Sequence, residues 1–119
     1  MTVFERGDVV KVPFPYTDRA SRQYRPALVV SSADLEATRG LVWVLMITSA
    51  ANRGWRSDVS ITDLSAAGLP APSVIRIAKI ATIEAKDAVR LGRVSASAFK
   101  KVLANVATEL GLGRNRLAS

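Results

Sequence analysis

The sequence predicts a mainly β fold, a small and strongly bent antiparallel sheet that one C-terminal helix closes. Its 119 residues suffice for a single domain with one core. Short apolar segments rich in β-branched residues recur between residues 8 and 84, and proline and glycine separate them. After residue 95 the apolar spacing changes from two residues to three and four, which indicates a helix. We therefore expect residues 1–119 to form one domain, a half-barrel that packs on its helix or on a second copy of the chain.

Two strands are predicted to flank a basic loop. Residues 7–15 contain a β-branched run followed by two prolines, which cannot continue a central strand, so a strand is predicted at about 8–13. Residues 27–32, "ALVVSS", have the valine and leucine content of a buried strand. The polar segment between them contains Arg22 and reaches Arg25, which precedes Pro26 at the start of the second strand.

The most apolar segment, residues 41–49, predicts a strand at the centre of the sheet. Residues 33–39, just before it, are compatible with a short helix that ends at Gly40. The strand itself ends at two hydroxyl side chains, Thr48 and Ser49.

Two shorter patterns and one helix complete the predicted fold. Residues 58–63 alternate polar and apolar, and residues 74–83 repeat that period in one or two strands. Between them, residues 64–72 predict one helical turn and a proline-rich loop. The final helix is predicted to have Ser95 as its N-cap and to end at Gly111.

The net charge of +7 favours a polyanionic partner. The chain has 17 lysines and arginines against 10 acidic residues. Because the planar guanidinium of arginine suits phosphate, nucleic acid is the leading partner class. The alternative is an arginine-rich composition without a specific partner, since net charge governs association rather than fold.

Missing residue types exclude several classes of site. Without cysteine there is no disulfide framework or thiolate, and without histidine the usual general base and the commonest metal ligand are missing. The acidic residues occur singly, and no glycine-rich phosphate loop is present, so we expect no metal and no cofactor. The longest apolar run is shorter than the roughly 20 residues of a membrane-crossing helix, and the N-terminus lacks a secretory pattern. We expect a cytoplasmic protein without membrane association.

Arginine and hydroxyl side chains remain as candidates for chemistry. If the strand that begins at Arg25 and the strand that ends at Thr48 and Ser49 are antiparallel neighbours, the guanidinium and the hydroxyls meet at one end of the sheet. RNA can be cleaved without a metal when its own 2′-hydroxyl attacks the adjacent phosphate, and fixed donors stabilise the more highly charged transition state. The alternative is that Arg25 is a solvated strand-edge charge and that both hydroxyls belong to a turn.

Four segments together resemble the MazF/PemK/Kid family of type II toxin–antitoxin ribonucleases. They are "GDVVKVPFPYTD", "YRPALVVSS", "LMITS" and "GLPAPSVIRIAKIATIE", in that order within residues 6–84. The resemblance implies an SH3-like barrel of the kind shared with the gyrase poison CcdB, and a homodimer. It also implies metal-independent, sequence-selective cleavage of single-stranded mRNA, and an antitoxin whose acidic, partly disordered tail folds onto the basic surface.

The resemblance also implies roles for individual residues. The family's arginine before proline is Arg25, and its threonine at the end of the apolar strand is Thr48; both would stabilise the transferring phosphate, assisted by Ser49. In the PemK and Kid branch the arginine of "SVIR", here Arg76, also belongs to the active site. The cations predicted to line the RNA groove are Arg22, Arg53, Arg56 and Lys79.

One position departs from the family pattern. In the PemK and Kid branch, an acid two residues after the "SVIR" arginine has been cast as the general base, and this chain has Ala78 there. The proton acceptor is then Asp18, Asp58 or a water molecule, and the sequence does not rank them.

A second class of function stays open on the same fold. A non-catalytic toxin, such as a gyrase poison of the CcdB type, or a nucleic-acid-binding module would also use a basic surface. A gyrase poison would depend on residues of its C-terminal helix, whereas the ribonuclease would depend on Arg25.

Overall fold

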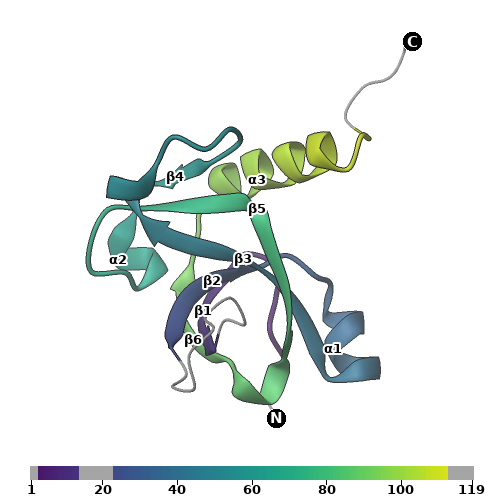
Figure 1. Ribbon diagram of the computed structural model, residues 1–119. Coiled ribbons are helices and arrows are strands. Elements are labelled where there is room, and N and C mark those ends of the chain that lie inside the picture. The colour runs from purple at the N-terminus through teal and green to yellow at the C-terminus, as the bar shows by residue number, and fades with distance from the viewer. Residues whose placement is uncertain (1–2, 14–22, 113–119) are drawn as a thin grey trace.

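The computed structural model describes residues 3–13 and 23–112, which form one curled six-stranded sheet with three helices (Figure 1). Neighbouring strands are antiparallel, in the order β4-β5-β3-β2-β1-β6. This architecture confirms the predicted mainly β half-barrel with a C-terminal helix. The strands are β1 (Asp8–Pro13), β2 (Tyr24–Val29), β3 (Leu41–Ser49), β4 (Val59–Ile61), β5 (Ser73–Glu84) and β6 (Val89–Arg93). The helices are α1 (Ala33–Arg39), α2 (Leu64–Ala67) and α3 (Ala96–Glu109), with 3₁₀ turns η1 (Ala50–Asn52) and η2 (Ala85–Asp87).

The curl of the sheet comes from an irregularity between β3 and β5. Leu45 pairs with Ile80, but the next residue, Met46, pairs with Arg76, so β5 contributes extra residues at this point. A bulge of this kind bends the strand that carries it. The pattern of residues 74–83, which predicted one or two strands, is therefore one long strand with a sharp bend, visible where β5 turns in Figure 1.

Apolar side chains on the two faces of the sheet form two separate clusters. Successive residues of a strand point to opposite faces, and the neighbours Val9 and Val10 accordingly belong to different clusters. The first cluster packs against α3, whose Val102 is fully buried, and the second lies on the other face of β1, β2 and β3. Strand β3 supplies both clusters from its place inside the sheet, as its apolar sequence predicts.

The predicted helix boundaries agree with the hydrogen bonding of α3. The Ser95 hydroxyl accepts from the Ala98 backbone N–H at 3.1 Å, the interaction of an N-cap. Beyond the last turn, Gly111 has φ +77°, a conformation that glycine adopts without a steric penalty. None of the helices in the part of the chain that the structure describes is long and apolar enough to cross a membrane.

Strand β6 has no counterpart among the strands expected from the sequence. It is five residues long and lies at the edge of the sheet, with Val89 exposed, so it carries no buried apolar run. Tertiary contacts hold it instead: the buried Asp8 carboxylate accepts from Arg93 Nη1 at 2.6 Å and forms an ion pair with Arg90, whose Nε is 3.2 Å away. A strand that is fixed by ion pairs and by its neighbour β1 lacks the periodicity on which sequence reasoning depends.

Gly92→Ala is expected to lower the free energy of unfolding by about 1–3 kcal/mol, because there is no room for a side chain between β6 and α2. A Cβ atom at Gly92 would overlap the backbone carbonyl groups of Ala66 and Ala67. Urea denaturation of the wild type and the variant measures the difference. An unchanged transition midpoint with an unchanged slope would contradict this close approach.

Candidate functional site

Arg25 and Thr48 lie at the same end of two adjacent strands. The last residue pair between β2 and β3 joins Ala27 to Met46. Arg25 is two residues before Ala27, and Thr48 is two residues after Met46. Because side chains two positions apart on a strand share a face, Arg25 and Thr48 are on one face of the sheet, at corresponding positions on neighbouring strands.

Arg25 is a half-buried residue, and its guanidinium forms an exposed hydrogen bond with a neutral partner. Its Nη2 donates to Gln23 Oε1 at 3.1 Å, which is a neutral acceptor. Among residues 3–13 and 23–112, no carboxylate forms an ion pair with Arg25. An arginine that no acid neutralises can bind an anionic phosphate through several N–H donors.

The two hydroxyl side chains at the end of β3 have different surroundings. Thr48 Oγ1 accepts from the side-chain Nδ2 of Asn52 at 3.0 Å. Ser49 Oγ accepts from the Ala51 backbone N–H at 3.1 Å and so caps the turn η1. As the next residue along the strand, Ser49 points to the face opposite Arg25, so only Thr48 lies on the same face as Arg25.

The guanidinium of Arg76 is buried and is hydrogen-bonded to the loop before β4. Its Nε and Nη2 donate to the two carboxylate oxygens of Asp58 at 3.2 and 2.9 Å, and Nη2 also donates to the Asn52 backbone carbonyl at 2.6 Å. The ring of Trp55 covers the guanidinium, with its centroid 4.2 Å from Cζ. Arg76 is near Thr48, because its partner on β3 is Met46, but protein groups occupy its Nε and Nη2 donors.

Of the two carboxylates that are candidate proton acceptors, Asp58 is described in the structure and is paired. Both carboxylate oxygens of Asp58 accept hydrogen bonds from Arg76, in a pair whose side chains are 7% and 8% exposed. Asp18 lies outside the described residues. Ala78, at the position where the PemK and Kid branch carries an acid, is an exposed residue of β5. Within the described ranges no three acidic side chains are grouped so that they could hold a metal ion.

Two of the four cations predicted to line an RNA groove lie beside the exposed indole of Trp55. Lys79 Nζ is 5.6 Å from the centre of that ring, and Arg56 lines a shallow hollow beside it. Arg53 is exposed, and its Nη1 donates to the Ala50 carbonyl at 3.0 Å. The fourth cation, Arg22, lies outside the described residues.

Sequence reasoning missed Asn52, whose side chain and backbone contact Thr48 and Arg76. Asparagine is common in loops, so no pattern distinguishes this one from a turn residue. Its contacts depend on the path of the loop in three dimensions, and the spacing of residues along the chain does not predict that path.

Comparison with known proteins places this chain in a family. A family model described as the PemK-like, MazF-like toxin of type II toxin–antitoxin systems matches residues 5–110. The chain belongs to the PemK/MazF toxin family. A comparison with curated proteins found no significant match.

Solved structures of MazF toxins share the fold of this PemK/MazF-family chain. The MazF structure from Deinococcus radiodurans is 24% identical with a TM-score of 0.75, and the match covers 93% of this chain and 99% of that one. An endoribonuclease in complex with its cognate antitoxin, from Mycobacterial species, is 21% identical with a TM-score of 0.73, over 97% and 100% of the two chains. The Mycobacterium tuberculosis toxin MazF-mt6 is 23% identical with a TM-score of 0.69, over 90% and 98%.

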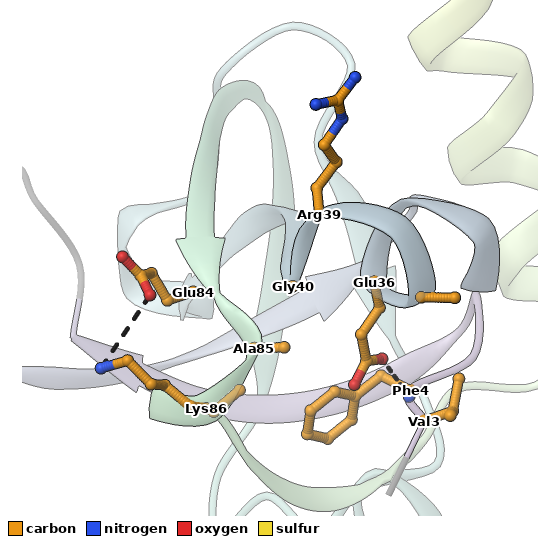
Figure 2. Close-up of a pocket in the computed structure, with 10 residues that line it drawn as sticks. Val3, Phe4, Glu36, Arg39, Gly40, Glu84, Ala85 and Lys86 are labelled. Atoms are coloured by element: carbon orange, nitrogen blue, oxygen red, sulfur yellow. Dashed lines mark hydrogen bonds and ion pairs between the residues drawn. The ribbon is translucent and has the colours of Figure 1, made fainter.

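This PemK/MazF-family chain also has a hollow of about 650 Å³ between α1 and η2, away from Thr48 (Figure 2). It lies beside Gly40, at the start of β3, whereas Thr48 is near the end of that strand. Three of its charged groups have partners within the protein: Glu36 Oε1 accepts from the Phe4 backbone N–H at 2.7 Å, and Lys86 Nζ is 4.0 Å from Glu84 Oε1. The hollow is therefore separate from the candidate site formed by Arg25 and Thr48.

Proposed function

We propose that this toxin is a metal-independent endoribonuclease that cleaves single-stranded mRNA and thereby arrests translation and growth. The observation that supports this most directly is the position of Arg25 and Thr48 on one face at the same end of β2 and β3, with the charge of Arg25 not neutralised by any described carboxylate. A phosphodiester placed between them would meet a cation and a hydroxyl. Membership in the PemK/MazF family supports the same function.

The proposed reaction is an internal transfer of the phosphoryl group. The 2′-oxygen of the substrate forms a bond to phosphorus, and the bond to the 5′-oxygen breaks. The products are a fragment with a 2′,3′-cyclic phosphate and a fragment with a 5′-hydroxyl. Arg25 and Thr48 donate hydrogen bonds to the non-bridging oxygens, where negative charge develops in the transition state.

The two proton transfers of this reaction need partners other than Arg25. The guanidinium of arginine stays protonated in proteins, so Arg25 stabilises charge and does not exchange a proton. Because both oxygens of Asp58 already accept from Arg76, we assign removal of the 2′-hydroxyl proton to Asp18 or to water. Water protonates the leaving 5′-oxygen. Ser49 assists from the end of β3 by holding the turn η1.

The RNA strand is proposed to lie across the cations around the loop before β4. Arg53, Arg56 and Lys79 would contact backbone phosphates, together with Arg22. The side chain of Trp55 is 47% exposed, so an unpaired base could stack on it. Such contacts follow the backbone and the faces of the bases, and they account for a preference for single strands.

The proposal includes two protein partners in the cytoplasm. The first is a second copy of the chain, because large apolar side chains remain exposed on the sheet, including Trp43 at 48% and Ile80 at 49%. The second is an acidic antitoxin attracted by the net charge of +7. Solved structures with this fold include MazE–MazF complexes from Deinococcus radiodurans.

Cleavage of a single-stranded RNA by the purified protein in excess EDTA tests the proposed function. We expect cuts that leave cyclic phosphate and 5′-hydroxyl ends, because the substrate supplies its own nucleophile. After the cut sites are mapped, the same RNA with a single 2′-deoxy nucleotide at one site should remain intact there and be cut elsewhere. Uncut RNA would favour the alternative class, a gyrase poison or a binding module, and cutting at the 2′-deoxy position would exclude this mechanism.

A further inference from the structure

The loop between β3 and β4 connects Thr48 to the buried Arg76 through one residue, Asn52. The Asn52 side-chain Nδ2 donates to Thr48 Oγ1 at 3.0 Å, and the Asn52 backbone carbonyl accepts from Arg76 Nη2 at 2.6 Å. We propose that Asn52 and Arg76 are positioning residues, which hold the Thr48 hydroxyl in the orientation that donates to the RNA phosphate. This inference rests on the proposed ribonuclease function.

Asn52 determines which way the hydroxyl of Thr48 can donate. A hydroxyl has one hydrogen to donate and two lone pairs that accept. Because the amide of Asn52 donates to the Thr48 oxygen, one lone pair is used and the hydrogen is directed elsewhere. The amide is also neutral, so it orients the hydroxyl without competing with Arg25 for the charge of the phosphate.

Arg76 fixes the loop that carries Asn52. It holds the beginning of the loop by the Asn52 carbonyl and the end by the Asp58 carboxylate, and Trp55 packs over it between these points. Its own position is set by β5, where it pairs with Met46, two residues before Thr48. The loop and the Thr48 hydroxyl are therefore both anchored to strands β3 and β5. Such anchoring keeps hydrogen-bond donors oriented before the substrate binds.

The surroundings of Arg76 favour this indirect role over contact with the phosphate. Its side chain is 7% exposed, and its Nε and Nη2 already donate to Asp58 and Asn52. Separating a buried, doubly hydrogen-bonded ion pair is costly, because the carboxylate is left uncompensated. Arg25, which is half-buried and paired with a neutral amide, has no such barrier.

A double-mutant cycle between Asn52 and Thr48 tests the positioning role. We expect Asn52→Ala to slow single-turnover cleavage about 3- to 10-fold, the effect of one hydrogen bond, and to leave the affinity for an uncleavable 2′-deoxy RNA unchanged. In a Thr48→Ala background the same change should have almost no effect, since no hydroxyl remains to be oriented. Equal losses in both backgrounds would overturn the proposal.

Asn52→Asp provides a second variant that keeps the size of the side chain. An ionised carboxylate can only accept, so it would take the hydrogen of Thr48 away from the phosphate. We expect a larger loss of cleavage than with Asn52→Ala, and a smaller loss would contradict the proposed orientation. Thr38→Ala, an exposed position of α1 at the opposite end of β3 from the loop, is the control and should cleave as the wild type does.

Asp58→Asn separates the possible roles of Arg76 and Asp58. The substitution weakens the hold on the loop but leaves the charge of Arg76 in place. Slower cleavage with an unchanged shape of the pH–rate profile supports positioning. Unchanged or faster cleavage would indicate that Arg76 acts on the phosphate directly, and loss of the acidic limb of the profile would make Asp58 the base; either result overturns the proposal.

The outcomes distinguish this inference from the proposed function. If the wild type leaves RNA intact in EDTA, the ribonuclease function itself is wrong, and the positioning role is wrong with it. If the wild type cleaves and Thr48→Ala is impaired while Asn52→Ala is not, only the positioning role is wrong.

Discussion

Replacing Arg25 with alanine is expected to lower the rate of RNA cleavage about 100- to 1,000-fold, the loss typical of removing one fixed donor to a transition-state oxygen. The guanidinium of Arg25 has only a neutral partner, Gln23, among the described residues, so its charge is available to the phosphate. Single-turnover cleavage of a labelled single-stranded RNA in EDTA measures the rate. The melting temperature should change little, because Arg25 makes no buried ion pair in the described part of the chain.

Arg39→Ala is the matched control for this experiment. Arg39 is an exposed arginine at the end of α1, just before the start of β3, whereas Thr48 lies near the far end of that strand. Its loss removes the same charge from the protein but should leave the cleavage rate unchanged. If both variants lose activity to the same extent, Arg25 contributes only to the net charge and the proposed site is wrong.

Arg76→Met is expected to lower the free energy of unfolding by about 3–5 kcal/mol, because it leaves the carboxylate of Asp58 buried without its partner. The two side chains are 7% and 8% exposed and are joined by two hydrogen bonds, so water cannot easily replace the guanidinium. The contact with Trp55, 4.2 Å from Cζ to the ring centre, is altered as well. Urea denaturation followed by circular dichroism measures the loss.

The double variant Arg76→Met/Asp58→Leu distinguishes a coupled pair from two independent residues. Removing both charges leaves no uncompensated ion, so the double variant should be more stable than Arg76→Met alone. The cycle isolates the coupling between the two positions. If the double variant lost stability relative to the wild type by the sum of the two single losses, the two positions would be uncoupled and the ion pair would not be the cause.

The two arginines illustrate how burial divides one residue type between two roles. Arg25 is the second residue of β2, is half-buried and has a neutral partner. Arg76 is near the same end of the neighbouring strands but is covered by Trp55 and paired with Asp58. The charge of Arg25 is therefore available to a ligand, whereas the charge of Arg76 stabilises the loop before β4.

Much of the fold could be predicted because apolar periodicity reflects burial on the faces of a sheet. Residues 41–49 read as a central strand and are β3, which lies inside the sheet. Residues from Ser95 read as an amphipathic helix and form α3, with Ser95 as its N-cap. Strand β6 could not be found in this way, because ion pairs with Asp8 and pairing with β1 hold it rather than a row of apolar side chains.

The candidate site was predictable only in part. Arg25 beside proline and Thr48 at the end of an apolar strand could be named from their positions, and the antiparallel register of β2 and β3 then brings them to one face. The partners of Arg76 could not be predicted from the sequence, since Asp58 is 18 positions and Asn52 is 24 positions away along the chain. No local pattern links residues at such separations.

By itself, the sequence determined the class of this protein: its apolar periods specify a half-barrel with a helix, and its missing cysteine and histidine and its net charge of +7 leave arginine and hydroxyl groups as the available chemistry. Only the tertiary structure decided which of these groups remain available to a ligand. The physical reason is that periodicity records which side chains are buried, whereas the partner of a buried polar group depends on where distant segments of the chain meet.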